Sequence, residues 1–115
     1  FIKCFVCFSI YCPIYNQMQV YLIKNAGGAY IIGFTSKKVS DRIVGLQTGA
    51  SSELEMVASY QTQRARQIEG ILHRTHRSKR RKGEWFDLTL EDEIKFCQMC
   101  AQIEHNLEFL EKNKI

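Results

Sequence analysis

The sequence has little proline, no long apolar segment and few acidic residues before residue 83. One proline among 115 residues, with 45% hydrophobic residues, excludes a disordered tail and fits one compact domain. The apolar run within residues 1–17 is too short to span a bilayer, so we expect no membrane partner. The 5 cysteines are most simply interpreted as reduced thiols of a cytoplasmic or nuclear protein.

Residues 1–82 carry 4 Asp+Glu against 13 Lys+Arg, a balance of +9, whereas residues 83–115 carry 8 against 3, a balance of −5. A basic body favours a polyanionic partner. The stretch HRTHRSKRRK, residues 73–82, holds six Lys+Arg and two His. Such a run is typical of a solvated face or of a nuclear-import-like patch, and nucleic-acid contact is a further interpretation. The run lies at the end of a helix, where cations also interact favourably with the helix dipole.

The first 17 residues, FIKCFVCFSIYCPIYNQ, contain one charge and three of the five cysteines. We therefore expect them to form an apolar extension or an added strand, and a single folded domain to occupy residues 18–115. Two CxxC pairs, Cys4/Cys7 and Cys97/Cys100, raise a zinc site, but about 90 residues separate them, against roughly 15 to 20 in a zinc ribbon. The second pair lies in a helical pattern, where a three-residue spacing places both thiols on one apolar face.

A β-hairpin is predicted from VYLI at 20–23 and YIIGF at 30–34, joined by the turn residues Asn-Ala-Gly-Gly at 25–28. Side chains alternate between faces along a strand, so Tyr21 shares a side with Ile23, and Tyr30 with Ile32. We expect the two phenols to lie near each other, either as core packing or as a functional pair.

The rest of the chain predicts an α/β fold with a small central antiparallel three-stranded sheet flanked by helices and a long C-terminal helix. The expected elements are a helix over 36–46, a strand over 53–60, a helix over 61–77 and a helix from 89 to about 112. The strand would place Leu54, Met56, Ala58 and Tyr60 on one side. The last helix would direct Leu90, Ile94, Cys97, Ala101, Leu107 and Leu110 inward or toward a partner.

Five motifs follow one another: VYLI, YIIG, SDRIVGLQTG, IEGILH and GEWF. In this order and spacing the chain resembles the GIY-YIG nuclease superfamily, in particular its phage-type branch with the GEWF motif, over about residues 19–88. The resemblance implies a catalytic domain that hydrolyses DNA phosphodiester bonds with Mg²⁺ (or Mn²⁺) as cofactor.

The resemblance also implies roles for individual residues. Tyr21 would activate the attacking water, although a free phenol has a pKa of about 10 and needs nearby cations to act as a base. Tyr30 would orient water or bond to the phosphate, and Arg42 would stabilise developing phosphate charge. Glu69 would hold the metal ion, because Mg²⁺ keeps most of its waters and needs few protein ligands.

The remaining positions have two interpretations each. His73 either orients water or phosphate or bonds structurally to GEWF, and Glu84 is either a polar site residue or a charge at a strand edge. Trp85 and Phe86 are expected in the core rather than stacked on bases. Ile31 stands where this branch often has lysine, which removes one cation from the site. Cations assigned to DNA contact are Lys37, Lys38, Arg74, Arg77, Lys79, Arg80, Arg81 and Lys82.

Two other functional classes stay open: a nucleic-acid-binding module with weak or no catalysis, and a structural domain whose tyrosines are core. Burial separates them, since a nuclease needs Tyr21, Tyr30, Arg42 and Glu69 to face one groove. Phosphate contacts carry no sequence information, so specificity cannot be predicted. The chain could be a fragment, act as a homodimer, or be fused to a DNA-recognition module.

Overall fold

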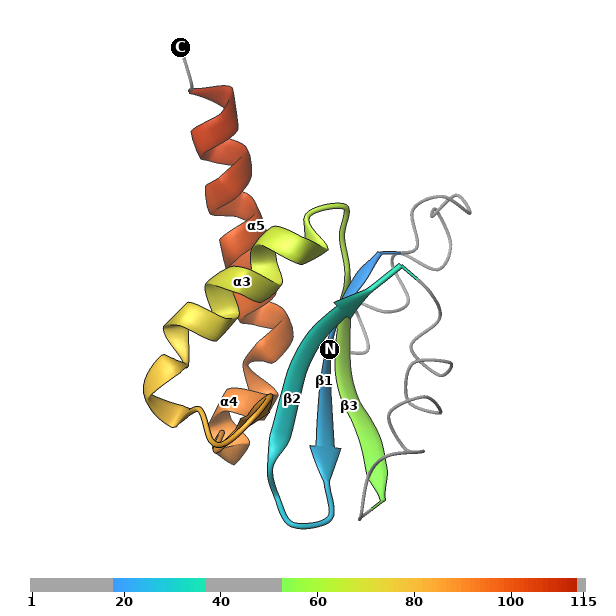
Figure 1. Cartoon of the computed structure of the whole chain (residues 1–115). Helices are drawn as coiled ribbons and strands as arrows, with labels where there is room; N and C mark the ends of the chain where they lie inside the picture. Colours follow the sequence, from blue (N-terminus) through green and yellow to red (C-terminus); the bar gives the residue numbers. More distant parts are fainter. Residues whose placement is uncertain (1–17, 37–52, 114–115) are drawn as a thin grey trace.

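The computed structural model describes residues 18–36 and 53–113 (Figure 1). In chain order the elements are β1 (Gln19–Asn25), β2 (Tyr30–Thr35), β3 (Leu54–Gln61), α3 (Ala65–Thr75), the 3-10 turn η2 (Arg77–Lys79), β4 (Trp85–Phe86), α4 (Leu90–Ile94) and α5 (Phe96–Lys112). The strands form an antiparallel sheet of order β3-β1-β2-β4. The α/β class is confirmed, with four strands in place of three, because GEWF adds a strand. The segment 1–17 and the helix expected after Ser36 lie outside the described residues.

The β1–β2 hairpin is confirmed, and Asn25 organises its turn. The Asn25 N–H donates to the Ala29 carbonyl at 2.9 Å, and the Ala29 N–H donates to Asn25 Oδ1 at 2.9 Å. Gly28 has φ +87, a conformation that glycine adopts without the steric penalty of a side chain. These bonds fix the strand register, in which Tyr21 lies opposite Gly33 and Lys24 opposite Tyr30.

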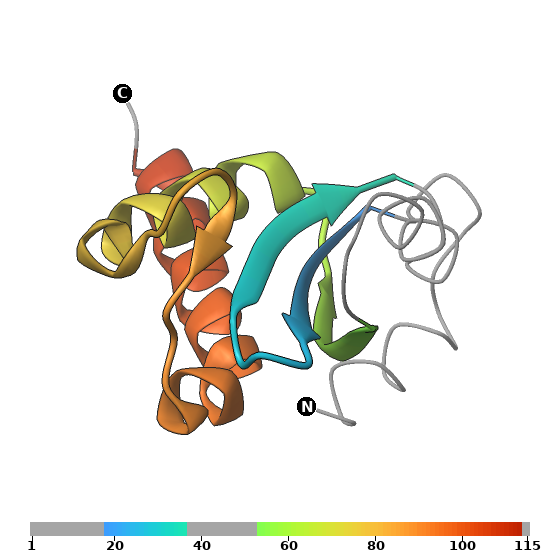
Figure 2. The ribbon, with the colours of Figure 1, turned by 60° about the horizontal axis from the view of Figure 1, so that its bottom comes forward.

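The sheet has two apolar faces. On one face the helices pack, as Figure 2 shows, and the core there includes Val20, Leu22, Tyr30, Ile32, Ala58, Tyr60, Ile68, Leu72, Phe86, Phe96, Cys97 and Cys100. On the other face a smaller cluster contains Tyr21, Ile23, Ile31 and Leu54, with Met56 and Trp85 packed against it. Each large apolar side chain buried in these clusters stabilises the fold by ~1.5–3 kcal/mol.

Strand β3 changes face along its length. Leu22 pairs with Ala58 and Ile23 pairs with Met56, so Val57 is an extra residue that forms a β-bulge. The expectation that Leu54, Met56, Ala58 and Tyr60 share one side is therefore wrong: the first two lie with Tyr21, the last two under the helices. Because Val57 is itself apolar, the sequence pattern does not reveal the insertion.

Helix α3 starts at Ala65, four residues later than expected, because β3 continues to Gln61. Thr62 then makes the turn, its Oγ1 accepting a hydrogen bond from the Arg64 N–H at 3.0 Å. Ala65, Ile68 and Leu72 are buried along one face of the helix, as their spacing predicts.

The predicted C-terminal helix is two helices that meet at Lys95. Thr89 caps α4 through a capping box with Asp92, as the TLED pattern predicts. In α5 the buried residues are Phe96, Cys97, Cys100 and Ile103. Leu90, Ile94 and Leu110 are exposed by 63%, 70% and 64%, and Ala101 is exposed, so these residues do not face the core. The alternative, that they face a partner, stays a prediction. Among the described residues, no helix has the length and apolarity to cross a membrane.

Candidate active site at the edge of strand β2

The phenol of Tyr21 lies across the backbone of Gly33. The two residues are direct partners in the β1–β2 ladder, and a Cβ at position 33 would be 2.4 Å from Tyr21 Oη and 2.5 Å from Cζ. No side chain fits there, so a glycine at this position leaves the space in which the Tyr21 hydroxyl lies over β2. Tyr21 is 2% exposed.

His73 reaches the same part of β2 from α3. β4 pairs only with Tyr30 and Ile31, and at the next residue the carbonyl of Ile32 accepts a hydrogen bond from His73 Nε2 at 2.8 Å. The imidazole also packs edge-on against Phe86, with ring centroids 5.0 Å apart and planes at 76°. His73 thus bonds to β2 at the residue where its pairing with β4 has stopped. This contact supports the structural interpretation of His73.

Glu69 stands one helical turn before His73, with its Oε2 3.9 Å from His73 Nε2. Desolvation raises the pKa of the Glu69 carboxyl above its usual value; His73 and Arg66 oppose that rise, and the charge of Glu84 adds to it. A half-dehydrated carboxylate close to a second one is the environment in which a divalent cation is favoured. The Ile32–Gly33 segment thus carries the Tyr21 phenol over its backbone and the His73 imidazole at the Ile32 carbonyl, and Glu69 is connected to it through His73.

The donor set at this edge fits a hydrated Mg²⁺ better than a protein-enclosed ion. Mg²⁺ prefers oxygen ligands and retains several waters, so the carboxylate of Glu69, with Glu84 near it, would suffice. Within residues 18–36 and 53–113, no group of three or more His, Cys, Asp or Glu side chains gathers as a metal cage.

Tyr30 does not join this site. Its hydroxyl donates to Glu93 Oε1 at 2.7 Å on the helix-covered face, and burial, together with the Glu93 hydrogen bond, raises the pKa of Tyr30 to about 12. Lys24 Nζ lies 5.5 Å from the Tyr30 ring centroid and 3.7 Å from Glu93 Oε1. The expectation that the two phenols lie near each other in one groove is therefore wrong, since they are on opposite faces of the sheet.

The basic run is only partly available for DNA. Lys79 forms an ion pair with Asp92 at 2.8 Å, Arg81 pairs with Asp87 at 3.3 Å, and Arg80 Nε donates to the Gly83 carbonyl at 3.1 Å. Arg74, Arg77 and Lys82 are exposed and form no ion pair with a described residue. The structure does not describe Arg42, Lys37 and Lys38, so their predicted roles stay predictions.

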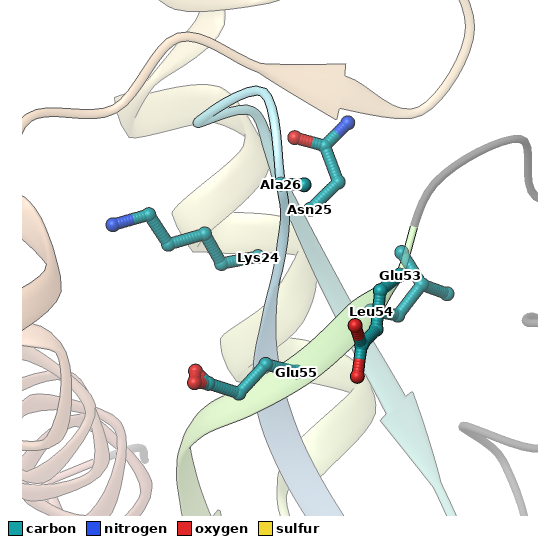
Figure 3. Close-up of a pocket in the computed structure, with 6 residues that line it drawn as sticks. All are labelled: Lys24, Asn25, Ala26, Glu53, Leu54 and Glu55. Carbon is teal, nitrogen blue, oxygen red and sulfur yellow. The ribbon is translucent and has the colours of Figure 1, made fainter.

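A cavity of about 530 Å³ lies beside the hairpin turn (Figure 3), and neither Tyr21 nor Glu69 lines it. It is lined by Lys24, Asn25, Ala26, Glu53, Leu54 and Glu55. Lys24 and Glu55 are partners in the β1–β3 ladder and leave it on the same side in this view. The lining mixes charges of both signs and includes none of the residues assigned to catalysis.

Sequence reasoning missed two residues that position the tyrosines. Gly33 was treated as part of a motif, although a glycine inside a strand is itself a sign of close approach by another group. No motif in the sequence points to Glu93, which is the hydrogen-bond acceptor of Tyr30. No local pattern could have identified Glu93, because 63 residues separate it from Tyr30.

The fold and this edge define a small α/β domain whose candidate site combines a phenol, a carboxylate and an imidazole. Residues 18–103 match the model of the T5orf172 domain, and the chain belongs to that family. This domain is found in phage-type endonucleases and is related to GIY-YIG and HNH-like nuclease families. Neither the curated proteins nor the solved structures gave a match.

Proposed function

We propose that the protein is a metal-dependent endonuclease that hydrolyses DNA phosphodiester bonds at the edge of β2. The observation that carries the proposal is the Tyr21 hydroxyl lying over Gly33, beside the Ile32 carbonyl that holds His73 one turn from Glu69. Membership of the T5orf172 family supports a nucleic-acid substrate. The order of motifs in the sequence supports the GIY-YIG type of chemistry.

In this proposal Tyr21 orients the attacking water and accepts its proton when the phenol is ionised. The water oxygen forms a bond to phosphorus as the bond to the leaving sugar oxygen breaks. Glu69, with Glu84 near it, would hold Mg²⁺ or Mn²⁺, which when bound supplies Lewis-acid stabilisation of phosphate charge. His73 acts as a positioning residue that fixes α3 against β2. The exposed cations Arg74, Arg77 and Lys82 would contact the DNA backbone.

The second candidate is a nucleic-acid-binding module with little or no catalysis. The 2% exposure of Tyr21 favours it, because a general base must reach a water bound beside the substrate. Tyr30, one of the proposed catalytic residues, also lies on the other face with its hydroxyl bonded to Glu93. Both candidates bind DNA, so only cleavage separates them.

Nicking of supercoiled plasmid with Mg²⁺, compared with EDTA, tests the proposal. Glu69→Gln removes the carboxylate charge and should reduce Mg²⁺-dependent nicking at least 100-fold. The matched control is Glu108→Gln on the exposed part of α5, which should nick like the natural sequence. Absence of metal-dependent nicking by the natural sequence, with salt-sensitive DNA binding retained, would establish the binding module instead.

A further inference from the structure

A second cavity, of about 260 Å³, lies between the hairpin turn and β4. It is lined by Asn25, Ala29, Arg81, Lys82 and Trp85. Its volume is just below the ~300–1,000 Å³ that is typical of small-molecule sites, so it suits a ligand of about one nucleotide. None of the residues assigned above to catalysis lines it.

The polar groups of this cavity are hydrogen-bond donors. Arg81 and Lys82 carry positive charge, and the Trp85 indole N–H can only donate. Asn25 Oδ1 accepts the Ala29 N–H at 2.9 Å, which leaves the Asn25 amide nitrogen as the end with donors to offer. Among the residues that the structure describes, no carboxylate lines the cavity. A ligand that fits must therefore be an anion rich in acceptors.

The backbone holds the cations beside the indole. The Arg81 N–H donates to the Trp85 carbonyl at 2.7 Å, which closes the turn that carries both basic residues. The ion pair of Arg81 with Asp87 is half-exposed on both sides, with side-chain exposures of 51% and 64%. Such a pair is weak, so a phosphate can replace Asp87 as the partner of Arg81 at little cost.

Trp85 connects this cavity with the candidate active site. The indole is half-buried, packs against the cluster that contains Tyr21, and pairs with Ile31 on β2. Ile31 is two residues from Gly33, which is roughly 7 Å along a strand. The cavity and the candidate active site are therefore neighbours along β2.

We propose, building on the proposed function, that this cavity binds one unpaired nucleotide of the DNA substrate near the cleaved phosphate. The base stacks on the indole of Trp85, its phosphate lies between Arg81 and Lys82, and Asn25 donates to acceptors on the base. A base inside a duplex is stacked on both faces and does not enter a pocket, whereas an unpaired base offers its whole π-face. The preferred substrate is then DNA with a single-stranded or displaced nucleotide.

The fluorescence of Trp85 tests this directly, because the chain has 1 tryptophan. The full chain carrying Glu69→Gln, in EDTA, is titrated with a short single-stranded oligothymidine and with an abasic oligonucleotide of equal length. We expect saturable quenching by the first and little by the second. Equal quenching by both, or no quenching at concentrations that saturate binding in an anisotropy assay, would overturn the proposal.

Variants separate stacking from charge. Trp85→Ala should weaken oligothymidine binding roughly 5- to 150-fold, whereas Trp85→Phe, which keeps an aromatic face, should keep most of the affinity. Lys82→Gln should weaken binding and lower its salt dependence, and Lys112→Gln at the exposed end of α5 should change neither. Thermal unfolding of each variant shows whether the fold is intact, and Lys82→Gln keeps the test decisive if Trp85→Ala does not fold.

The proposal and the nuclease assignment fail in different assays. Quenching without any plasmid nicking supports the nucleotide cavity and removes the endonuclease. Metal-dependent nicking with equal affinity for duplex and single-stranded DNA, and no quenching, keeps the endonuclease and removes the cavity.

Discussion

Tyr21 and Tyr30 are both 2% exposed and lie on neighbouring strands, yet their hydroxyls meet different surroundings. The Tyr30 hydroxyl donates to Glu93 under the helices, where it joins the hairpin to α4. The Tyr21 hydroxyl lies on the opposite face, over a glycine at the edge bordered by α3. Equal burial therefore does not imply an equal role: the Tyr30 hydroxyl bonds to a carboxylate of a covering helix, whereas the Tyr21 hydroxyl lies against the backbone of β2.

The difference arises from strand parity. Tyr21 pairs with Gly33, so the residues of β2 on its face are Gly33 and, two positions earlier, Ile31. Tyr30 is one position before Ile31, so its side chain points to the face that the helices cover. Side chains alternate along β2, so Tyr30 and Gly33 face opposite ways. If YIIG were one residue shorter, its tyrosine would lie on the same face as Tyr21.

Removing each hydroxyl gives the largest contrast. Tyr21→Phe should reduce plasmid nicking at least ~100-fold, because a general base contributes about 10²–10⁴ in rate. Tyr30→Phe should leave nicking within about threefold, since its hydroxyl bonds to Glu93 away from β2's edge. Rates of supercoil loss at matched protein concentration measure both. A larger loss in Tyr30→Phe than in Tyr21→Phe would reverse the assignment of the two faces.

A methyl group at position 33 tests the contact between the two strands. Gly33→Ala should lower the free energy of unfolding by ~1–3 kcal/mol, because its Cβ would meet Tyr21 Oη at 2.4 Å. Most of this loss should disappear in a Tyr21→Leu background, where Cζ and Oη are absent. Urea unfolding of the four proteins measures the coupling.

Gly70→Ala in α3 is the matched control for Gly33→Ala. The nearest atom to its Cβ would be Arg74 Nη1 at 3.8 Å, so the alanine fits without a clash. Because alanine has the higher helix propensity, the free energy of unfolding should rise by ~0.5–1 kcal/mol. Additive losses for Gly33→Ala and Tyr21→Leu would mean that the phenol does not rest on the glycine.

Unfolding at alkaline pH should show the smallest change in the free energy of unfolding, and it tests the contribution of Tyr30. Its pKa in the fold is about 12 against 10 for an ordinary tyrosine, so the neutral phenol is the favoured form in the folded state. The Tyr30 contribution is complete below pH 10 and is lost as the pH rises through 12. Tyr30→Phe should cost ~1 kcal/mol at neutral pH. Urea unfolding from pH 8 to 12 should show this difference shrinking above pH 10, and a constant difference would contradict it.

The sequence predicts the hairpin, the buried face of α3 and the capping of α4 well, because each depends on residues a few positions apart. It does not predict which face each tyrosine occupies, because that follows from the register between strands and from the β-bulge at Val57. It also predicts one helix where the chain has two meeting at Lys95. Residues four apart on a helix lie on the same side, so the spacing of Glu69 and His73 predicts their proximity, which the structure confirms.

The edge of β2 past Ile31 is held by an imidazole from α3 rather than by a continuing strand. Because this side chain bonds to the Ile32 carbonyl, the positions of α3 and of β2 depend on each other. Glu69 and Gly33 are therefore connected through His73, which lies one turn from Glu69 and bonds to the residue before Gly33. A change at any buried contact of α3, such as Ile68 or Leu72, would then alter the distance between carboxylate and phenol without touching either group.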